Sequence, residues 1–264
     1  MTNLFSIFRQ AMPDGNAPFI ATSTGRGLAY GEMLALSGRM ANVLVGLGVK
    51  PGDRVAAQVE KSPEAIVLYL ACLRLGAVYL PLNTAYTLAE IEYFVADAEP
   101  AVFVAAPAKA AIIAPLAAKH EVAAVETLGS DGEAGSLLAR AREARAEFAD
   151  YRAEDSDLAA ILYTSGTTGR SKGAMLSHGN LASNALTLKD VWRFGRDDVL
   201  LHALPIFHTH GLFVACNVVL AAGAAMIFLP KFEPDEIFRL LPRATTMMGV
   251  PTFYVRLLQD TRLT

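Results

Sequence analysis

The run YTSGTTGRSKG at residues 163–173 has the residue types and the spacing that phosphate chemistry needs. It combines several glycines and hydroxyl side chains with two cations, Arg170 and Lys172, directly after an apolar stretch at 158–163. Glycine lets the backbone approach a ligand closely, and successive N–H groups in such turns form an anion-binding concavity. Hydroxyls add donors, and Lys172 adds a point charge suited to phosphate. The run predicts a phosphate-binding loop; the alternative is an ordinary solvated loop.

The run differs from other well-known loop motifs. Ser171 stands where a Walker A loop needs a glycine before its lysine, and the run contains no G-x-G-x-x-G fingerprint. The chain also lacks a G-x-S-x-G elbow, so an α/β-hydrolase would have no nucleophile.

Two histidines, His208 and His210, stand two positions apart in the apolar run LPIFHTHGL at 204–212. A metal pair would need further ligands, and the spacing of His178 and His202 does not supply them. Two interpretations stay open for His208, a structural histidine with its hydrogen bonds satisfied or a side chain that faces a substrate carboxylate. For His210 the structural role is favoured.

The elements that must position these residues alternate between helix and strand. Helical spacing or capping signals predict helices at 30–47, 64–75, 87–98, 108–119, 180–193, 211–222, 234–242 and after Pro251. Apolar runs predict strands at 54–59, 77–80, 101–105, 122–125, 158–163, 199–204, 225–229 and 245–248. Nearly continuous apolar strands between helices indicate an α/β fold, with layered, parallel-rich sheets covered by helices.

Two stretches depart from this alternation. Residues 129–156 change in character: 129–132 are a predicted loop, and 133–154 are rich in Ala, Arg and Glu, which predicts an exposed helix and linker and the best internal boundary of the chain. Residues 212–229 form a run without charged side chains, and the length of this run is close to that of a membrane-spanning helix. Gly223 interrupts that run, however, and we expect a buried helix followed by a buried strand and no membrane association.

Composition and charge exclude several classes of protein. The chain has 264 residues, 53% of them hydrophobic, and a formal charge of −3, which excludes disorder and shows no basic stripe for nucleic acid. Cys72 and Cys216 lie in apolar runs and are expected to be buried thiols in a reducing compartment. The N-terminus has no signal-peptide pattern, so we expect a cytoplasmic protein.

The run at 163–173 resembles the phosphate-binding signature of the acyl-adenylate-forming, AMP-dependent synthetases, with Ser171 where that family commonly has proline. Segments 53–55, 75–83 and 175–180 are similar to other family segments in the same order. Within the family, LPIFHTHGL together with GVPTFYVRLL at 249–258 looks most like the malonyl-CoA synthetases. A dicarboxylate needs a cation for its distal group. Arg256 is nearby in sequence, but a charge on a helix surface is the favoured interpretation of it, and the resemblance implies that the arginine lies downstream of residue 264.

The resemblance implies a two-step reaction with ATP, Mg²⁺ and coenzyme A. A small carboxylic acid, malonate by preference, forms an acyl-adenylate, and CoA then displaces AMP. The implied catalytic residues are Lys172 and His208, with His208 also binding substrate and Thr164 also contacting the metal. The implied nucleotide-binding residues are Thr164, Ser165, Gly166, Thr167, Thr168, Gly169 and Lys172.

The resemblance also implies that residues 1–264 form an incomplete large N-terminal domain, without the C-terminal lid domain. The chain alone is then expected to be inactive, and its partner is the missing C-terminal portion of the same enzyme. The alternatives are an aryl- or fatty-acyl-CoA ligase, or a nucleotide-binding fragment without catalysis.

Overall fold

The computed structural model describes residues 3–164 and 171–262. The chain divides into two compact units. Unit 1 comprises Met1–Ile7 and Leu34–Ser183, and unit 2 comprises Phe8–Met33 and Asn184–Thr264. The predicted linker near 129–156 therefore lies inside unit 1.

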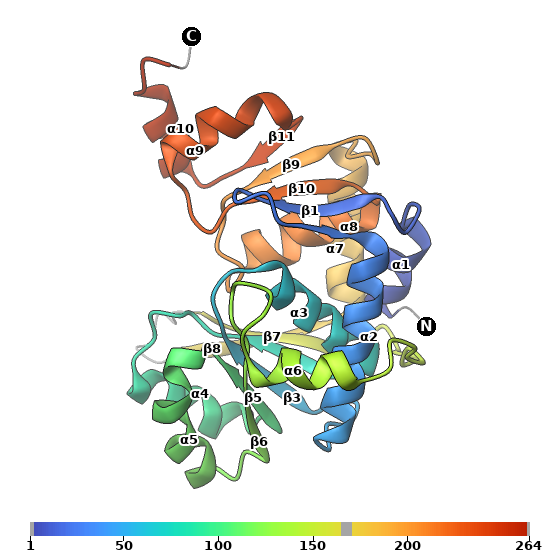
Figure 1. Cartoon of the computed structure of the whole chain (residues 1–264), viewed down its shortest axis with the longest axis vertical. Coiled ribbons are helices and arrows are strands. Elements are labelled where there is room, and N and C mark those ends of the chain that lie inside the picture. Colours follow the sequence, from blue (N-terminus) through green and yellow to red (C-terminus); the bar gives the residue numbers. More distant parts are fainter. Residues whose placement is uncertain (1–2, 165–170, 263–264) are drawn as a thin grey trace. The chain divides into compact units, whose positions relative to one another are not determined.

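The sheet of unit 1 has the strand order β6-β5-β3-β4-β7-β8 (Figure 1). In chain order its strands are β3 Arg54–Gln58, β4 Val78–Pro81, β5 Val102–Ala105, β6 Ala124–Thr127, β7 Leu158–Thr164 and β8 Lys172–Ser177. Neighbouring strands run parallel except β7 and β8, which are antiparallel. Strands β4 and β5 are buried along their whole length, which explains their uninterrupted apolar sequences.

Outside the polar segment 129–156, the predicted helices of unit 1 begin and end within two residues of their predicted bounds. The helices of unit 1 are α2 Tyr30–Gly46, whose first residues belong to unit 2, α3 Pro63–Leu75, α4 Leu88–Ala98, α5 Ala110–Lys119 after the 3-10 turn η1 Pro107–Lys109, and α6 Ser136–Glu143. The capping box of Thr87 and Glu90 is present at the start of α4. Gly76 ends α3 with a left-handed φ of 78°. On α4 and α5, Phe94 and Ile113 are buried in one core cluster with Phe103 of β5.

The sheet of unit 2 has the order β11-β9-β10-β1-β2. Its strands are β1 Pro18–Thr22, β2 Gly27–Ala29, β9 Val199–His202, β10 Ala225–Phe228 and β11 Thr246–Met248, all parallel to their neighbours except β2. Its helical segments are the π-helix η2 His210–Cys216, α8 Asn217–Ala222, α9 Pro234–Leu240, the 3-10 turn η3 Leu241–Arg243 and α10 Pro251–Leu258. Helices α1 Leu4–Ala11 and α7 His178–Val191 have residues in both units.

The structure differs from the sequence-based expectation at the polar segment 129–156. Only α6 is helical there, and the extended residues after it are held by long side chains rather than left as a linker. Arg39 donates to the backbone carbonyls of Arg142 and Ala144, and Asn42 donates to those of Arg145 and Glu147. Farther along, the buried Arg74 pairs with Asp150 at 2.6 Å and donates to the Phe148 carbonyl.

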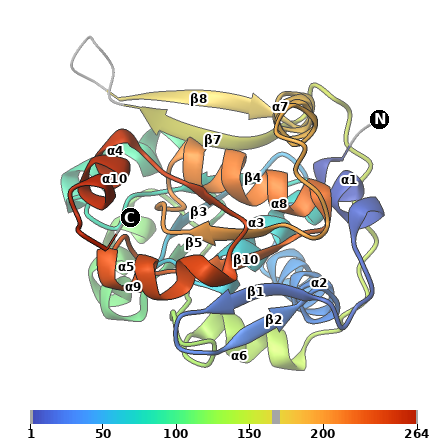
Figure 2. The same cartoon turned by 90° about the horizontal axis from the view of Figure 1, so that it is seen from above.

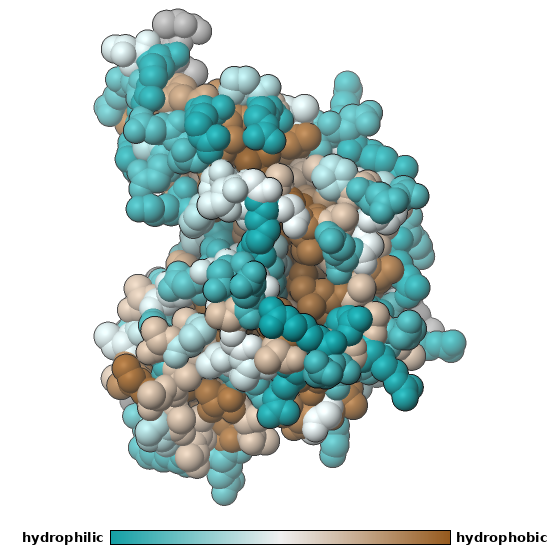
Figure 3. All heavy atoms as spheres, viewed as in Figure 1, coloured by the Kyte–Doolittle hydropathy of each residue, from teal (hydrophilic) through white to brown (hydrophobic). Residues whose placement is uncertain are grey.

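The uncharged run 212–229 forms part of η2, then α8 and β10, as a buried helix followed by a buried strand. Within the described residues, no helix is long and apolar enough to cross a membrane. Hydrophilic and hydrophobic residues are interspersed over the face drawn in Figure 3.

Candidate active site

The predicted phosphate segment joins β7 to β8, two long neighbouring strands in Figure 2. Thr164, the last residue of β7, pairs with Lys172, the first residue of β8, and both are exposed. The predicted ligands Ser165, Gly166, Thr167, Thr168 and Gly169 lie outside the described residues. The register therefore places a hydroxyl and an ammonium side chain opposite one another at the base of the predicted loop.

Tyr163 anchors this end of the hairpin to α4. Its buried ring lies against Phe94, with ring centroids 4.4 Å apart, and its hydroxyl donates to the carboxylate of Asp97. Burial, and secondarily the hydrogen bond to Asp97, raises the pKa of Tyr163, so the hydroxyl keeps its proton. Across the hairpin, a Cβ atom at Gly173 would lie 3.0 Å from Cγ2 of Ile161 and 3.4 Å from the Tyr163 ring. Close packing against Ile161 and Tyr163 therefore explains why the last residue of the run, Gly173, has no side chain.

The side chains at the hairpin base suit a magnesium polyphosphate. Among the described residues, no ion pair involves Lys172, so its charge is available to an anion. The hydroxyl oxygen of Thr164 is a hard ligand of the kind that Mg²⁺ accepts. The described ranges hold no group of three or more His, Cys, Asp or Glu side chains that could bind a metal by themselves. The residues present thus fit a metal ion that arrives with a phosphate ligand.

A buried network in unit 2 shapes the segment that carries His208 and His210. His202, 1% exposed, places its Nε2 2.8 Å from the carbonyl oxygen of Gly211, and the Cys216 thiol donates to the same oxygen at 3.2 Å. A Cβ atom at Gly211 would lie 2.0 Å from the carbonyl oxygen of Pro205. Only glycine permits this approach of two backbone segments. The π-helix η2 begins at this point, and such helices often occur at functional sites.

The two histidines of this segment have different surroundings. His208 is exposed, with its ring centroid 4.6 Å from that of Phe207. Partial desolvation lowers the pKa of His208, so the ring is neutral near pH 7 and can donate one hydrogen bond and accept another. His210 instead lines a pocket of about 510 Å³. Sequence reasoning had favoured a structural role for His210, and its place in a pocket wall was not predicted.

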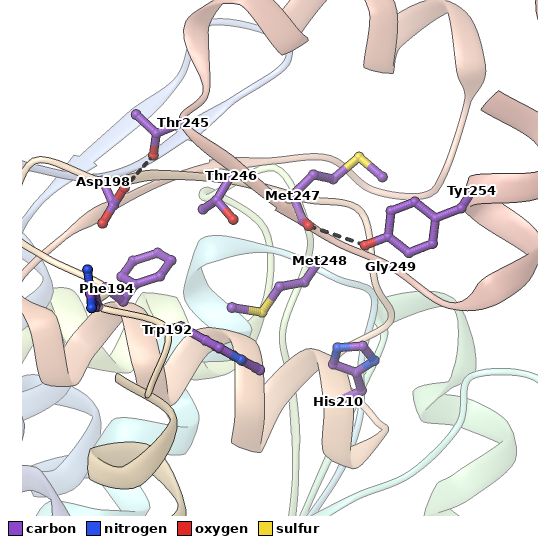
Figure 4. A pocket seen from close by; sticks show the side chains of 11 residues that line it. Trp192, Phe194, Asp198, His210, Thr245, Thr246, Met247, Met248, Gly249 and Tyr254 are labelled. Carbon is purple, nitrogen blue, oxygen red and sulfur yellow. Dashed lines mark hydrogen bonds between the residues drawn. The ribbon is translucent and has the colours of Figure 1, made fainter. Parts of the chain in front are cut away.

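The pocket lies wholly within unit 2 and has the edge strand β11 as one wall (Figure 4). Figure 4 shows Trp192, Met248 and His210 facing the same space. Two hydrogen bonds connect residues that line the pocket. The Thr245 hydroxyl donates to the Asp198 carboxylate at 2.7 Å, and the Tyr254 hydroxyl donates to the Met247 carbonyl at 3.3 Å. The pocket is lined by Trp192, Arg193, Phe194, Asp198, His210, Thr245, Thr246, Met247, Met248, Gly249 and Tyr254.

The sequence pointed to some of the residues that line this pocket and not to others. Gly249 and Tyr254 belong to the segment 249–258 that the family resemblance had marked. Trp192 was missed, although it is the single tryptophan of the chain and follows directly after α7. Arg256 does not line the pocket; its guanidinium lies 4.9 Å from the ring centroid of Phe232, and its side chain is exposed.

Comparisons with known proteins agree with this chemistry. Residues 7–264 match the family described as AMP-binding enzyme. MatB from Rhodopseudomonas palustris, whose structure has been solved both without ligand and with ATP bound, is 61% identical with a TM-score of 0.96. That match covers 100% of this chain and 52% of the MatB chain.

Curated relatives show a similar partial coverage. Feruloyl-CoA synthase of Amycolatopsis sp is 34% identical over 234 residues, which is 87% of this chain and 45% of the relative. The mitochondrial malonate–CoA ligase ACSF3 of Homo sapiens is 28% identical over 264 residues, which is 96% of this chain and 45% of the relative. The chain therefore spans about half the length of the proteins that it matches.

Proposed function

The chain belongs to the family of AMP-binding enzymes, and on that basis we propose that it supplies the ATP-phosphate site and part of the acyl site of an AMP-forming acyl-CoA ligase. The observation that carries the proposal is the hairpin β7–β8, which pairs Thr164 with Lys172 near the two ends of the phosphate signature. The likeness of the whole chain to MatB, a protein solved with ATP bound, supports it.

In the proposed reaction, a carboxylate oxygen attacks the α-phosphorus of ATP, and the bond from that phosphorus to the pyrophosphate oxygen breaks. The thiol of CoA then attacks the acyl carbon, and AMP leaves. Catalysis of this kind rests on positioning and on stabilisation of charge. Lys172 would hold the β- and γ-phosphates together with residues 165–169. Mg²⁺, bound with Thr164, would supply further positive charge to the phosphates. The neutral ring of His208 would orient the carboxylate by a hydrogen bond.

We propose malonate as the carboxylic acid. The support is the likeness of segments 204–212 and 249–258 to malonyl-CoA synthetases and the match of nearly the whole chain to a malonate–CoA ligase. An aryl or fatty acid is the second candidate, favoured by the 34% identity to feruloyl-CoA synthase.

The partner of the chain in this proposal is the remaining portion of the same enzyme, and the edge of β11 is where we expect it to pack. Among the described residues β11 pairs with β9 only. Large apolar side chains of the same unit are exposed: Trp192, which lines the pocket beside β11, is 46% exposed, and Val255 and Leu258 of α10 are 51% and 73% exposed. About half of MatB lies outside its match to this chain, which provides the chain length to cover such a surface. We also propose a cytoplasmic location, supported by two buried free thiols, Cys72 and Cys216.

The test compares the 264-residue chain with a chimera in which it is joined to the unmatched portion of R. palustris MatB. ATP–pyrophosphate exchange and hydroxamate formation are measured with malonate, methylmalonate, benzoate and octanoate. We expect the chain to be inactive and the chimera to be active with malonate. Turnover by the chain alone would contradict the proposal that it supplies only part of the active site. A chimera that folds and binds ATP but activates none of these acids would contradict the proposed acyl-CoA ligase activity.

A further inference from the structure

Two residues one turn apart on α4 contact the phosphate signature near its two ends, one at a residue of β7 and one at the residue before β8. The Tyr93 hydroxyl donates to the backbone carbonyl of Ser171, the residue before β8, at 2.9 Å. The Asp97 carboxylate accepts a hydrogen bond from the hydroxyl of Tyr163, the last residue but one of β7. Positions i and i+4 lie on the same face of a helix, so a single helical face holds the chain where it enters the predicted loop and where it returns.

Helix α4 is well suited to act as a fixed support. Its first turn is closed by the capping box of Thr87 and Glu90. Phe94 and Val95, between the two polar contacts in sequence, are 2% and 0% exposed and belong to the core of unit 1. A hairpin end that is fastened to this helix therefore shares the rigidity of the core.

We propose that Tyr93 is a positioning residue of the nucleotide site and that Asp97 assists it: together they hold the hairpin base in the geometry in which it meets the phosphates of ATP. This inference rests on the proposed function of the hairpin. Tyr93 does not itself reach the phosphates; it acts through the Ser171 backbone, adjacent to Lys172. Its effect is therefore on the binding of the polyphosphate and not on the chemistry of the carboxylic acid.

The chain offers a matched control in Tyr86. The Tyr86 ring also packs on Phe94, with centroids 4.9 Å apart, whereas that of Tyr93 lies 5.5 Å from Phe94. Among the described residues no hydrogen bond of the Tyr86 hydroxyl is found. Tyr93→Phe and Tyr86→Phe thus remove the same atom from the same aromatic cluster, and only the first loses a bond to the hairpin.

The first experiment titrates the 264-residue chain with magnesium tripolyphosphate, followed by ³¹P NMR, with urea unfolding as the measure of stability. Loss of one hydrogen bond predicts a dissociation constant about three- to tenfold higher for Tyr93→Phe, and no change for Tyr86→Phe. Asp97→Ala should weaken binding, and Asp97→Asn, which keeps an acceptor oxygen, should restore it. In the active chimera, Tyr93→Phe should raise KM for ATP by a similar factor while KM for malonate stays constant.

The outcomes distinguish a failure of the proposed function from a failure of the positioning role of Tyr93. Failure of the unmodified chain and of the chimera to bind the polyphosphate overturns the proposed function and this inference with it. Binding that is equal in the unmodified chain and Tyr93→Phe overturns the positioning role alone. So does an equal loss in Tyr93→Phe and Tyr86→Phe, because that pattern reports aromatic packing rather than the bond to Ser171.

Discussion

Acidification is expected to destabilise the protein through one buried histidine, His178. Its side chain is 0% exposed, and its Nδ1 accepts the backbone N–H of Leu4 at 3.1 Å. The neutral ring therefore carries its proton on Nε2. A second proton would have to replace the bond to Leu4 and place a charge in the interior. Burial lowers the pKa of His178 from 6.5 to about 4, and the nearby charge of Asp157 opposes this shift only in part.

The sign and size of the effect follow from linkage. The unfolded chain takes up a proton near pH 6.5, whereas folded His178 does so near pH 4. The stabilisation from a neutral His178 is therefore fully present above about pH 6.5 and is lost as the pH falls towards 4. A difference of roughly 2.5 pKa units at 1.36 kcal/mol each corresponds to about 3 kcal/mol of unfolding free energy. Because total stabilities are about 5–15 kcal/mol, this loss is large enough to measure.

The assay is urea unfolding at several pH values between 7.5 and 4.5, with His178→Gln as the comparison. The glutamine amide does not titrate, and every other ionisable group is common to both proteins. We expect the original chain to lose about 2–3 kcal/mol more than the variant over this range. Two parallel stability curves would refute the reasoning, as would an NMR titration in which the folded His178 ring has its midpoint near pH 6.5.

Three further outcomes follow from the described contacts. Lys172→Ala should weaken binding of magnesium tripolyphosphate by roughly tenfold or more because a charge-assisted contact is lost; the exposed Lys50→Ala serves as control, and equal affinities would remove Lys172 from the site. Gly211→Ala should destabilise the protein by about 1–3 kcal/mol, since its Cβ would meet the Pro205 carbonyl oxygen at 2.0 Å, whereas Gly46→Ala, in open space on α2, should be neutral or stabilising in thermal melts. Emission of the single tryptophan, Trp192, isolated by subtracting the Trp192→Phe spectrum, should shift to shorter wavelength in the chimera as the β11 edge is covered; an unchanged maximum would count against that packing site.

Features that depend on neighbouring residues in the chain were predictable. The alternation of apolar helices and strands predicted most elements of both sheets from residue 30 onward, because burial on both faces leaves a continuous apolar run. The capping box of Thr87 and Glu90 is local as well, and it is present. Gly76 and Gly223 both end helices with a left-handed φ, as their positions between helix and strand indicated.

Features that depend on distant residues were not predictable in the same way. No helix or strand was predicted before residue 30, although β1 pairs with β10 through Ile20 and Met226, residues far apart in sequence. The polar segment 129–156 was interpreted as a linker because its composition is that of a solvated chain. Arg39 and Arg74 hold it in unit 1 instead, by hydrogen bonds that no local pattern encodes.

For the candidate site, the sequence by itself determined which chemical groups are present and in what order: the glycines, hydroxyls and Lys172 of a phosphate-binding run, and a histidine pair farther along. The tertiary structure decided how those groups are held. Only the fold brings Tyr93 to Ser171 and places His210 in a pocket wall with Trp192. The physical reason is that residue type and short-range spacing specify chemistry and local geometry, whereas the partners of a side chain across a sheet are set by packing over many residues of separation.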